Sequence, residues 1–212
     1  MKITPFKELK KNLKKDLKTL SNIKVALIGD NPTQLLAIAI RGMGMERGYN
    51  IELFESEYDQ VERQFLDPTS ELHNFNADYI VVFQSTHKLV SAYNKSSVED
   101  QSRIADERLE FLKLMYNSTQ SKFVYFNYPE IDDSVFGSYA NKVESSFTYQ
   151  IRKLNYELMN LAVQSPNLFI CDIAALQNKF GRDMMFDSSV YVTTEMVLSI
   201  DAIPYIASRT MD

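Results

Sequence analysis

The sequence has little of what builds disulfide frameworks, zinc sites or membrane spans. Its 212 residues include one cysteine, Cys171, and two histidines, which excludes an internal disulfide and disfavours a structural zinc site. A single cysteine is compatible with a reducing cytoplasm, where we expect the protein to reside. No apolar run approaches the roughly 18 residues of a membrane span, and no apolar stretch follows the N-terminal charges as in a secretory signal. We therefore expect neither a membrane span nor a signal peptide.

Charge is distributed unevenly along the chain. The net charge is −5, yet residues 1–24 hold eight lysines against Glu8 and Asp16, a local net charge of +6. The remaining residues hold 15 basic and 26 acidic side chains, so we expect no nucleic-acid partner for the body of the protein. The basic segment also has an apolar residue at every third or fourth position, namely Phe6, Leu9, Leu13, Leu17 and Leu20. This spacing predicts an amphipathic helix over residues 1–22, packed on a single domain over 23–212.

Short apolar runs alternate with helical patterns along the rest of the chain. The predicted strands are 24–29, 51–54, 79–83, 123–126 and 168–171. The predicted helices are 32–46, a short one capped by Asp67, 97–118, one from 143 to about 161, and 194–203, broken at Pro204. This alternation predicts a three-layer α/β/α fold with a flavodoxin-like, parallel five-stranded sheet.

The first strand ends in the sequence Gly29-Asp30-Asn31-Pro32. Asn31 suits a helix N-cap and Pro32 the first helical position, so this polar cluster should lie at the carboxyl end of the sheet, where open α/β folds carry their sites. Esterases of the SGNH type have Gly-Asp-Ser here, and that serine is the nucleophile. An asparagine amide cannot form the acyl-enzyme. Asn31 could instead donate to an anion or oxyanion, or it could be an ordinary cap beside Asp30.

Other polar residues follow the predicted strands, whose carboxyl ends meet at one edge of the sheet. They complete a candidate binding set of Gly29, Asp30, Asn31, Asp59, Gln84, Ser85, Asn127 and Glu130. Ser85 is the candidate for an unconventional nucleophile, with His87 as its base, although a plain loop is the more ordinary interpretation. Cys171 lies in an apolar strand, where a thiol is usually a small buried hydrophobe. We predict no metal site.

A second informative segment runs from Asp187 to Thr194. Serine esterases of this architecture end with Asp-x-x-His before the final helix. Asp187 is in place, but Val190 stands at the position of the histidine. Tyr191 follows it, and a tyrosine with an ordinary pKa near ~10 is a poor general base at neutral pH. The candidate catalytic residues Asp30, Ser85, Asp187 and Tyr191 thus lack a complete triad, and the sequence leaves open whether the protein is an enzyme.

Four segments together resemble a known family. They are 29–36, 58–72, 127–130 and, most specifically, 141–156. They resemble the N-terminal SGNH-hydrolase-like domain of FkbH-like proteins, which are HAD-superfamily phosphatases of subfamily IIIC, and the similarity covers essentially the whole chain. The predicted fold is accordingly SGNH-hydrolase-like.

The resemblance carries expectations about partners and cofactors. In that family a HAD phosphatase-like domain follows, beginning with an Asp-x-Asp motif and using magnesium. FkbH takes a glyceryl unit from bisphosphoglycerate, dephosphorylates it and places it on an acyl carrier protein for methoxymalonyl extender-unit synthesis. This sequence contains no Asp-x-Asp. The resemblance therefore implies an N-terminal piece of a longer protein, or an orphan copy, with no cofactor of its own and with a HAD domain and an acyl carrier protein as partners.

Three functions follow as hypotheses. The leading one is a degenerate SGNH-like module that binds substrate or carrier protein for a neighbouring catalytic domain. Its basic helix could steer an acidic carrier protein, although the lysines could equally just solvate a helix whose leucines dock on the sheet. The second is an acyl-ester or thioester hydrolase with an unconventional nucleophile. The third is phospho-ligand binding at the turn 29–33, against which stands the lack of a glycine-rich phosphate loop.

Overall fold

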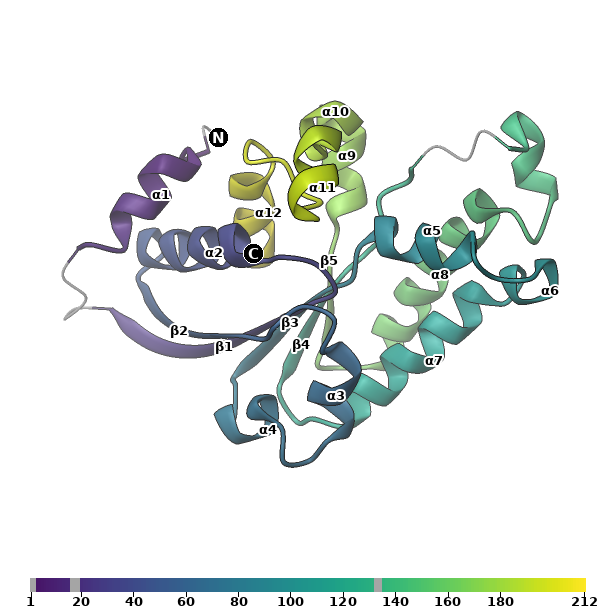
Figure 1. Ribbon diagram of the computed structural model, residues 1–212. Helices are drawn as coiled ribbons and strands as arrows, with labels where there is room; N and C mark the ends of the chain where they lie inside the picture. The colour runs from purple at the N-terminus through teal and green to yellow at the C-terminus, as the bar shows by residue number, and fades with distance from the viewer. Residues whose placement is uncertain (1–2, 16–19, 132–134) are drawn as a thin grey trace.

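The structure, a computed structural model, describes residues 3–15, 20–131 and 135–212 (Figure 1). Its centre is a five-stranded sheet in the order β2-β1-β3-β4-β5, with every pair parallel. The strands are β1 (Ser21–Gly29), β2 (Tyr49–Glu55), β3 (Tyr79–Phe83), β4 (Lys122–Phe126) and β5 (Leu168–Cys171). The predicted parallel sheet is confirmed, and its order is that of flavodoxin-like folds.

Helices cover both faces of the sheet. One face carries α1 (Phe6–Asn12), α2 (Gln34–Glu46), α9 (Ile173–Phe180) and α12 (Ile203–Thr210). The other carries α3 (Val61–Leu66), α4 (Glu71–Phe75), α5 (Thr86–Tyr93), α7 (Ile104–Asn117) and α8 (Phe147–Gln164). The connections hold α6 (Val98–Gln101), the 3-10 helix η1 (Gly137–Lys142), α10 (Arg182–Met185) and α11 (Ser188–Thr194). Among the described residues, no helix has the length and apolar character to cross a membrane.

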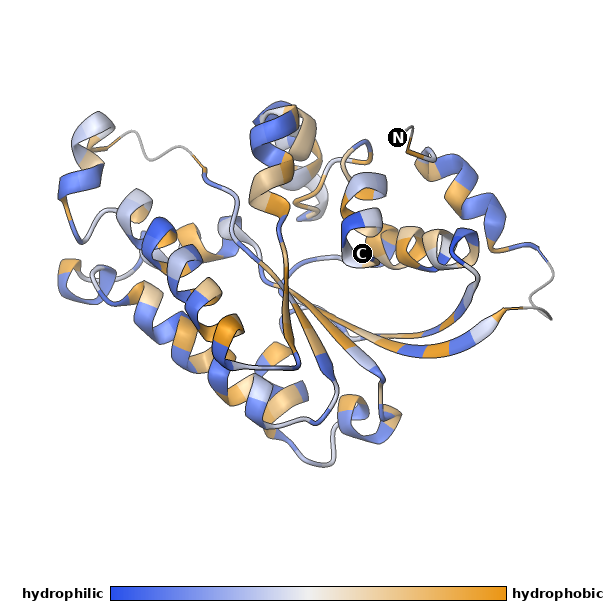
Figure 2. Ribbon diagram, turned by 180° about the vertical axis from the view of Figure 1, so that it is seen from behind, coloured by the Kyte–Doolittle hydropathy of each residue, from blue (hydrophilic) through white to orange (hydrophobic). Residues whose placement is uncertain are grey.

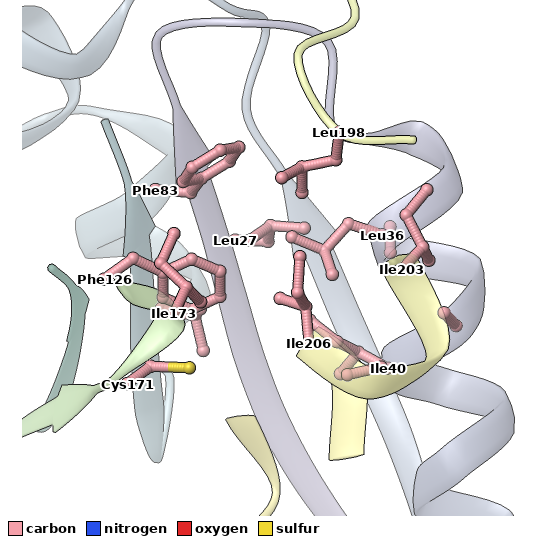
Figure 3. Close-up of a cluster of buried hydrophobic side chains, with 14 of the residues drawn as sticks. Leu27, Leu36, Ile40, Phe83, Phe126, Cys171, Ile173, Leu198, Ile203 and Ile206 are labelled. Carbon is pink, nitrogen blue, oxygen red and sulfur yellow. The ribbon is translucent and has the colours of Figure 1, made fainter. Parts of the chain in front are cut away.

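The strands are apolar on both sides because they feed two cores. Successive side chains of a strand point to opposite faces, so Leu27 joins the core under α2 and α12 while Ile28 joins the core under α7 and α8. Figure 3 shows the first core, in which Leu36 and Ile206 approach Leu27 from the two helices. In Figure 2 the strands are mostly hydrophobic and the helices alternate between hydrophilic and hydrophobic residues. This arrangement accounts for the uninterrupted apolar runs in the sequence.

The basic N-terminal helix is shorter than predicted. Its described part is α1, and β1 already begins at Ser21, so the helix does not reach residue 22. Leu17 and Lys18, which the prediction included, lie outside the described residues. Leu9 is fully buried against α2, where a Cβ on Gly42 would lie 2.7 Å from the Leu9 carbonyl carbon. Leu9 therefore anchors α1 on α2.

Several predicted helix boundaries are wrong for local reasons. Ser70, not Asp67, caps α4, since its hydroxyl accepts a hydrogen bond from the His73 amide. The predicted helix over 194–203 does not exist, because α11 ends at Thr194 and α12 begins at Ile203. Pro204 starts that helix instead of breaking it, since the first turn needs no proline N–H.

Two long predicted helices differ less. The helix predicted over 97–118 is divided into α6 and α7, and α8 begins at Phe147 instead of near residue 143. Ser146 caps α8 by accepting a hydrogen bond from the Tyr149 amide.

Candidate functional site

Asp30 joins the ends of two neighbouring strands at the carboxyl edge of the sheet. Its carboxylate oxygens lie 2.9 and 3.1 Å from the amide nitrogen of Ser85, which follows β3. The Asn31 side-chain amide donates to the same carboxylate at 2.9 Å. Burial raises the pKa of Asp30 above its ordinary value, while these two donors and the nearby Arg108 charge oppose the rise. Asp30 therefore links the turn after β1 to the turn after β3 through hydrogen bonds.

Asn31 is the residue that the sequence interpretation compares with the serine of SGNH esterases. It is 1% exposed, and its amide nitrogen is already engaged by Asp30. The structure does not make it a helix cap, because α2 begins at Gln34 with Thr33 in the cap position. Thr33 instead donates through its hydroxyl to Glu55 at the end of β2. The neighbouring Gly29 leaves room for this turn, since a Cβ there would lie 2.8 Å from the Thr33 methyl carbon.

Buried polar atoms without a hydrogen-bond partner gather at this edge. Within the described ranges they are Asn31 Oδ1, Ser56 Oγ and His87 Nδ1. They follow β1, β2 and β3, which are adjacent in the sheet. Buried polar groups are nearly always bonded, and an unmade bond costs about 1–3 kcal/mol. Their common position at three adjacent strand ends makes this edge the candidate binding site.

Ser85, the candidate nucleophile, is buried and caps a helix. It is 1% exposed, and its hydroxyl caps α5 by accepting a hydrogen bond from the Lys88 amide at 3.2 Å. His87, two residues on, lies with its ring 5.0 Å from the ring of Phe186 and 4.9 Å from that of Tyr191. Burial, together with the charge of Arg182, lowers the pKa of His87, so its imidazole is neutral at pH 7.

The segment that carries the catalytic histidine in esterases has a structural role here. Asp187 caps α11, its Oδ1 accepting from the amides of Ser189 at 2.9 Å and Val190 at 3.2 Å. Tyr191 packs on the His87 ring. The structure thus brings a histidine from the end of β3 next to this segment. Sequence reasoning considered His87 only as a partner of Ser85, because nothing in the sequence shows which loops meet.

A buried polar chain lies behind Asp30. The Tyr125 hydroxyl donates to Gln84 Oε1 at 2.8 Å and lies 2.6 Å from the Tyr128 hydroxyl. Burial raises the pKa of Tyr125 well above its ordinary value. The guanidinium of Arg108, on α7, interacts electrostatically with both tyrosines and with Asp30. Sequence reasoning missed Arg108, because an arginine in an amphipathic helix resembles any solvated charge.

The remaining predicted residues lie on the rim and have partners of their own. Asn127 donates to Asp172 at 2.8 Å and accepts from the amide of Ala174, fixing the start of α9. Glu130 forms a two-point ion pair with Arg152 at 2.7 and 2.9 Å, which lowers the pKa of Glu130. The structure does not bring these residues into the Asp30 cluster.

Asp59 and Cys171 complete the survey of candidates. Asp59 is exposed and left-handed, with φ of 61°, and lies 3.5 Å from the Lys88 ammonium. Burial raises the pKa of Cys171 to about 12, which makes it an unreactive thiol, in line with the interpretation as a buried hydrophobe. Over residues 3–15, 20–131 and 135–212, no three His, Cys, Asp or Glu side chains come together as metal ligands would.

Comparison with protein families matches residues 24–212 to the FkbH N-terminal domain. The chain belongs to the FkbH N-terminal domain family. A similar solved structure is the N-terminal part of the protein BF1531 from Bacteroides fragilis, containing a phosphatase domain complexed with Mg. It is 54% identical, with a TM-score of 0.97, and the match covers 99% of this chain and 56% of that one. This chain thus spans little more than half the length of that structure.

More distant structures share the fold of this FkbH N-terminal domain. A lipase/acylhydrolase from Enterococcus faecalis has a TM-score of 0.55 at 13% identity, over 88% of this chain and 92% of that one. The acetyl xylan esterase AlAXEase has a TM-score of 0.52 at 13% identity, over 89% and 98%. The comparison with curated proteins gave no match. The SGNH-hydrolase-like fold is therefore confirmed, and at such low identity the likeness concerns the fold alone.

Proposed function

We propose that this chain is a non-hydrolytic SGNH-like module of an FkbH-like protein, which binds substrate or an acyl carrier protein for a neighbouring HAD phosphatase domain. The observation that carries the proposal is Asn31 at the nucleophile position. It is buried, its amide nitrogen is held by Asp30, and its oxygen lies among the unbonded buried polar atoms at the strand ends. Such an edge offers hydrogen bonds to a ligand, whereas the amide of Asn31 cannot take up an acyl chain as a serine hydroxyl would.

The proposed neighbouring domain and the proposed transferred group are inferred from the family to which the chain belongs. The resemblance to FkbH implies transfer of a glyceryl unit to an acyl carrier protein, and the Bacteroides fragilis relative contains a phosphatase domain. A module that holds the carrier or the unphosphorylated acyl group beside such a domain would raise its local concentration without adding a chemical step. This role fits a site with hydrogen-bonding groups and no triad.

The lysines of α1 and the turn after it supply a surface for the carrier protein. Lys7, Lys10, Lys11, Lys14 and Lys15 are all exposed, while Leu9 anchors the helix. Acyl carrier proteins are strongly acidic, so a fixed row of ammonium groups would steer them electrostatically. Because the leucine side is already buried against α2, the lysine side remains available for docking.

The first experiment is a hydrolysis panel. Short acyl esters and acyl thioesters are offered to the purified protein and to an Asp30→Ala, Asn31→Ala double variant whose fold is checked by circular dichroism. We expect no turnover above that of the double variant. Turnover that the variant loses would contradict the proposal and establish the alternative, a hydrolase with an unconventional nucleophile. A phosphorylated ligand that raised the melting temperature would favour the phospho-ligand alternative instead.

The second experiment tests carrier docking with matched charge changes. An acidic acyl carrier protein is titrated against Lys10→Glu, Lys14→Glu, Lys15→Glu and, separately, against Lys95→Glu, Lys113→Glu, Lys142→Glu, all exposed positions. The first triple variant should bind about tenfold or more weakly, and the second should bind like the parent at the same net charge. Equal affinity of the two variants for the carrier protein would contradict the proposal that the lysines of α1 and the following turn bind it.

A further inference from the structure

A groove opens on the α2 and α12 face of the sheet, beside the end of the chain. Its volume is about 520 Å³, and its walls come from β1, β3, β4 and β5. Apolar side chains that line it are Ile23, Val25, Tyr79, Val81 and Val124. Arg209 and Thr210 at the end of α12, and Met211 and Asp212 directly after it, form one side of the groove.

The sheet register shows where this face is left uncovered. Leu27, Val81, Val124 and Phe169 are register neighbours on successive strands. Leu27 is 0% and Val81 2% exposed, Val124 is half-buried, and Phe169 is 48% exposed. The helices therefore cover less of this sheet face toward β5. The helix α12, with eight residues, is only ~12 Å long and stops at the groove.

The edge of the groove is cationic. The Lys122 ammonium lies 5.0 Å from the centre of the Tyr79 ring, and the exposed Arg209 also lines the groove. Apolar side chains together with two cations fit an amphipathic segment with acidic residues beside its apolar face. The same features would not attract a basic segment.

We propose that this groove is the docking site for the polypeptide that follows the position of Asp212 in longer members of the family. Two observations support this occupant. The match covers only 56% of the Bacteroides fragilis chain, so a large part of that protein lies outside it. Residue 212 itself lines the groove, so a segment that followed it could enter the groove directly. The inference rests on the proposed function only in requiring a neighbouring domain.

The test uses the 212-residue chain and a synthetic peptide. A fluorescent peptide of the ~15 residues that follow the matched region in the Bacteroides fragilis protein, ~22 Å if helical, is titrated with the chain, and its anisotropy is measured. We expect saturable binding that Phe169→Glu weakens by about tenfold or more, because aromatic anchors carry much of the energy at such surfaces. A second variant, Arg209→Glu, should also weaken binding.

The controls separate this inference from its rivals. Val163→Glu, at a side chain 88% exposed on α8, should bind the peptide like the parent. Unchanged melting temperatures show that the variants fold. No saturable binding, or equal binding by Phe169→Glu, would overturn the proposal. So would self-association of the parent that Phe169→Glu abolishes, because a second copy would then occupy the groove. The lysine variants of α1 should bind the peptide normally, so failure here leaves the carrier proposal untouched.

Discussion

The two buried tyrosines behind Asp30 should differ sharply in what their hydroxyls contribute to stability. The single hydroxyl proton of Tyr125 is donated to Gln84, so Tyr128 must donate to the Tyr125 oxygen. Tyr125→Phe therefore leaves both the Gln84 carbonyl and the Tyr128 hydroxyl unpaired in a fully buried place. At about 1–3 kcal/mol for each of the two unsatisfied groups, we expect a loss of about 2–6 kcal/mol in the free energy of unfolding. Tyr128→Phe removes one hydrogen bond and leaves no donor unpaired, so it should lower the free energy of unfolding by only about 0.5–1.5 kcal/mol.

Urea denaturation of the parent and the two variants measures both losses. A Gln84→Leu, Tyr125→Phe double variant is the control, because it removes the acceptor together with the donor. Its loss of stability should be smaller than the sum of the losses in Gln84→Leu and Tyr125→Phe, measured separately, by a coupling energy of about 0.5–3 kcal/mol. The reasoning is refuted if Tyr128→Phe costs as much as Tyr125→Phe, since the direction of the hydrogen bonds would then be wrong.

Three further predictions concern other parts of the molecule. Gly42→Ala should lower the free energy of unfolding by about 1–3 kcal/mol, since its Cβ would collide with Leu9 of α1; thermal denaturation measures this. The pKa of His87 is lower in the folded chain than its ordinary value near ~6.5, so its contribution to stability is complete above that pH and is lost as pH falls through the folded pKa. The pH dependence of unfolding should therefore flatten in His87→Gln; an unchanged profile would contradict this. Cys171 should resist iodoacetamide in the native protein and react only on unfolding, which mass spectrometry detects.

The sheet could be predicted from the sequence because each strand is buried on both faces. The runs 79–83 and 168–171 coincide with β3 and β5, since apolar runs bounded by polar residues leave little choice of ends. Helices were harder. α5 has only eight residues, so Leu89 and Tyr93 on its buried side form too short a repeat to identify a helix from the sequence. Pro204 was misinterpreted because a proline in a first turn and a proline that breaks a helix look alike in sequence.

The position of the candidate site could be predicted from the sequence, but the contacts between its side chains could not. The rule that parallel strands end at one edge was enough to select Asp30, Asn31 and Ser85. That Asp30 accepts from the Ser85 amide depends on side-chain direction, which no spacing reveals. Arg108 reaches the cluster from a helix more than 70 residues away in sequence from Asp30, and its approach is a result of how α7 packs. Contacts of this kind follow from the tertiary fold.

The packing of α1 bears on where this domain starts. The family match begins at residue 24, yet Leu9 is fully buried and Asn12 donates to Glu46 at 2.9 Å. A shortened chain that starts at residue 24 would expose the surface of α2 that Leu9 covers and leave Glu46 without that donor. Such a chain should aggregate more readily than the full one. The family model begins within β1, whereas the packing of the domain extends to the helix before it, so an expressed form of this domain should include α1.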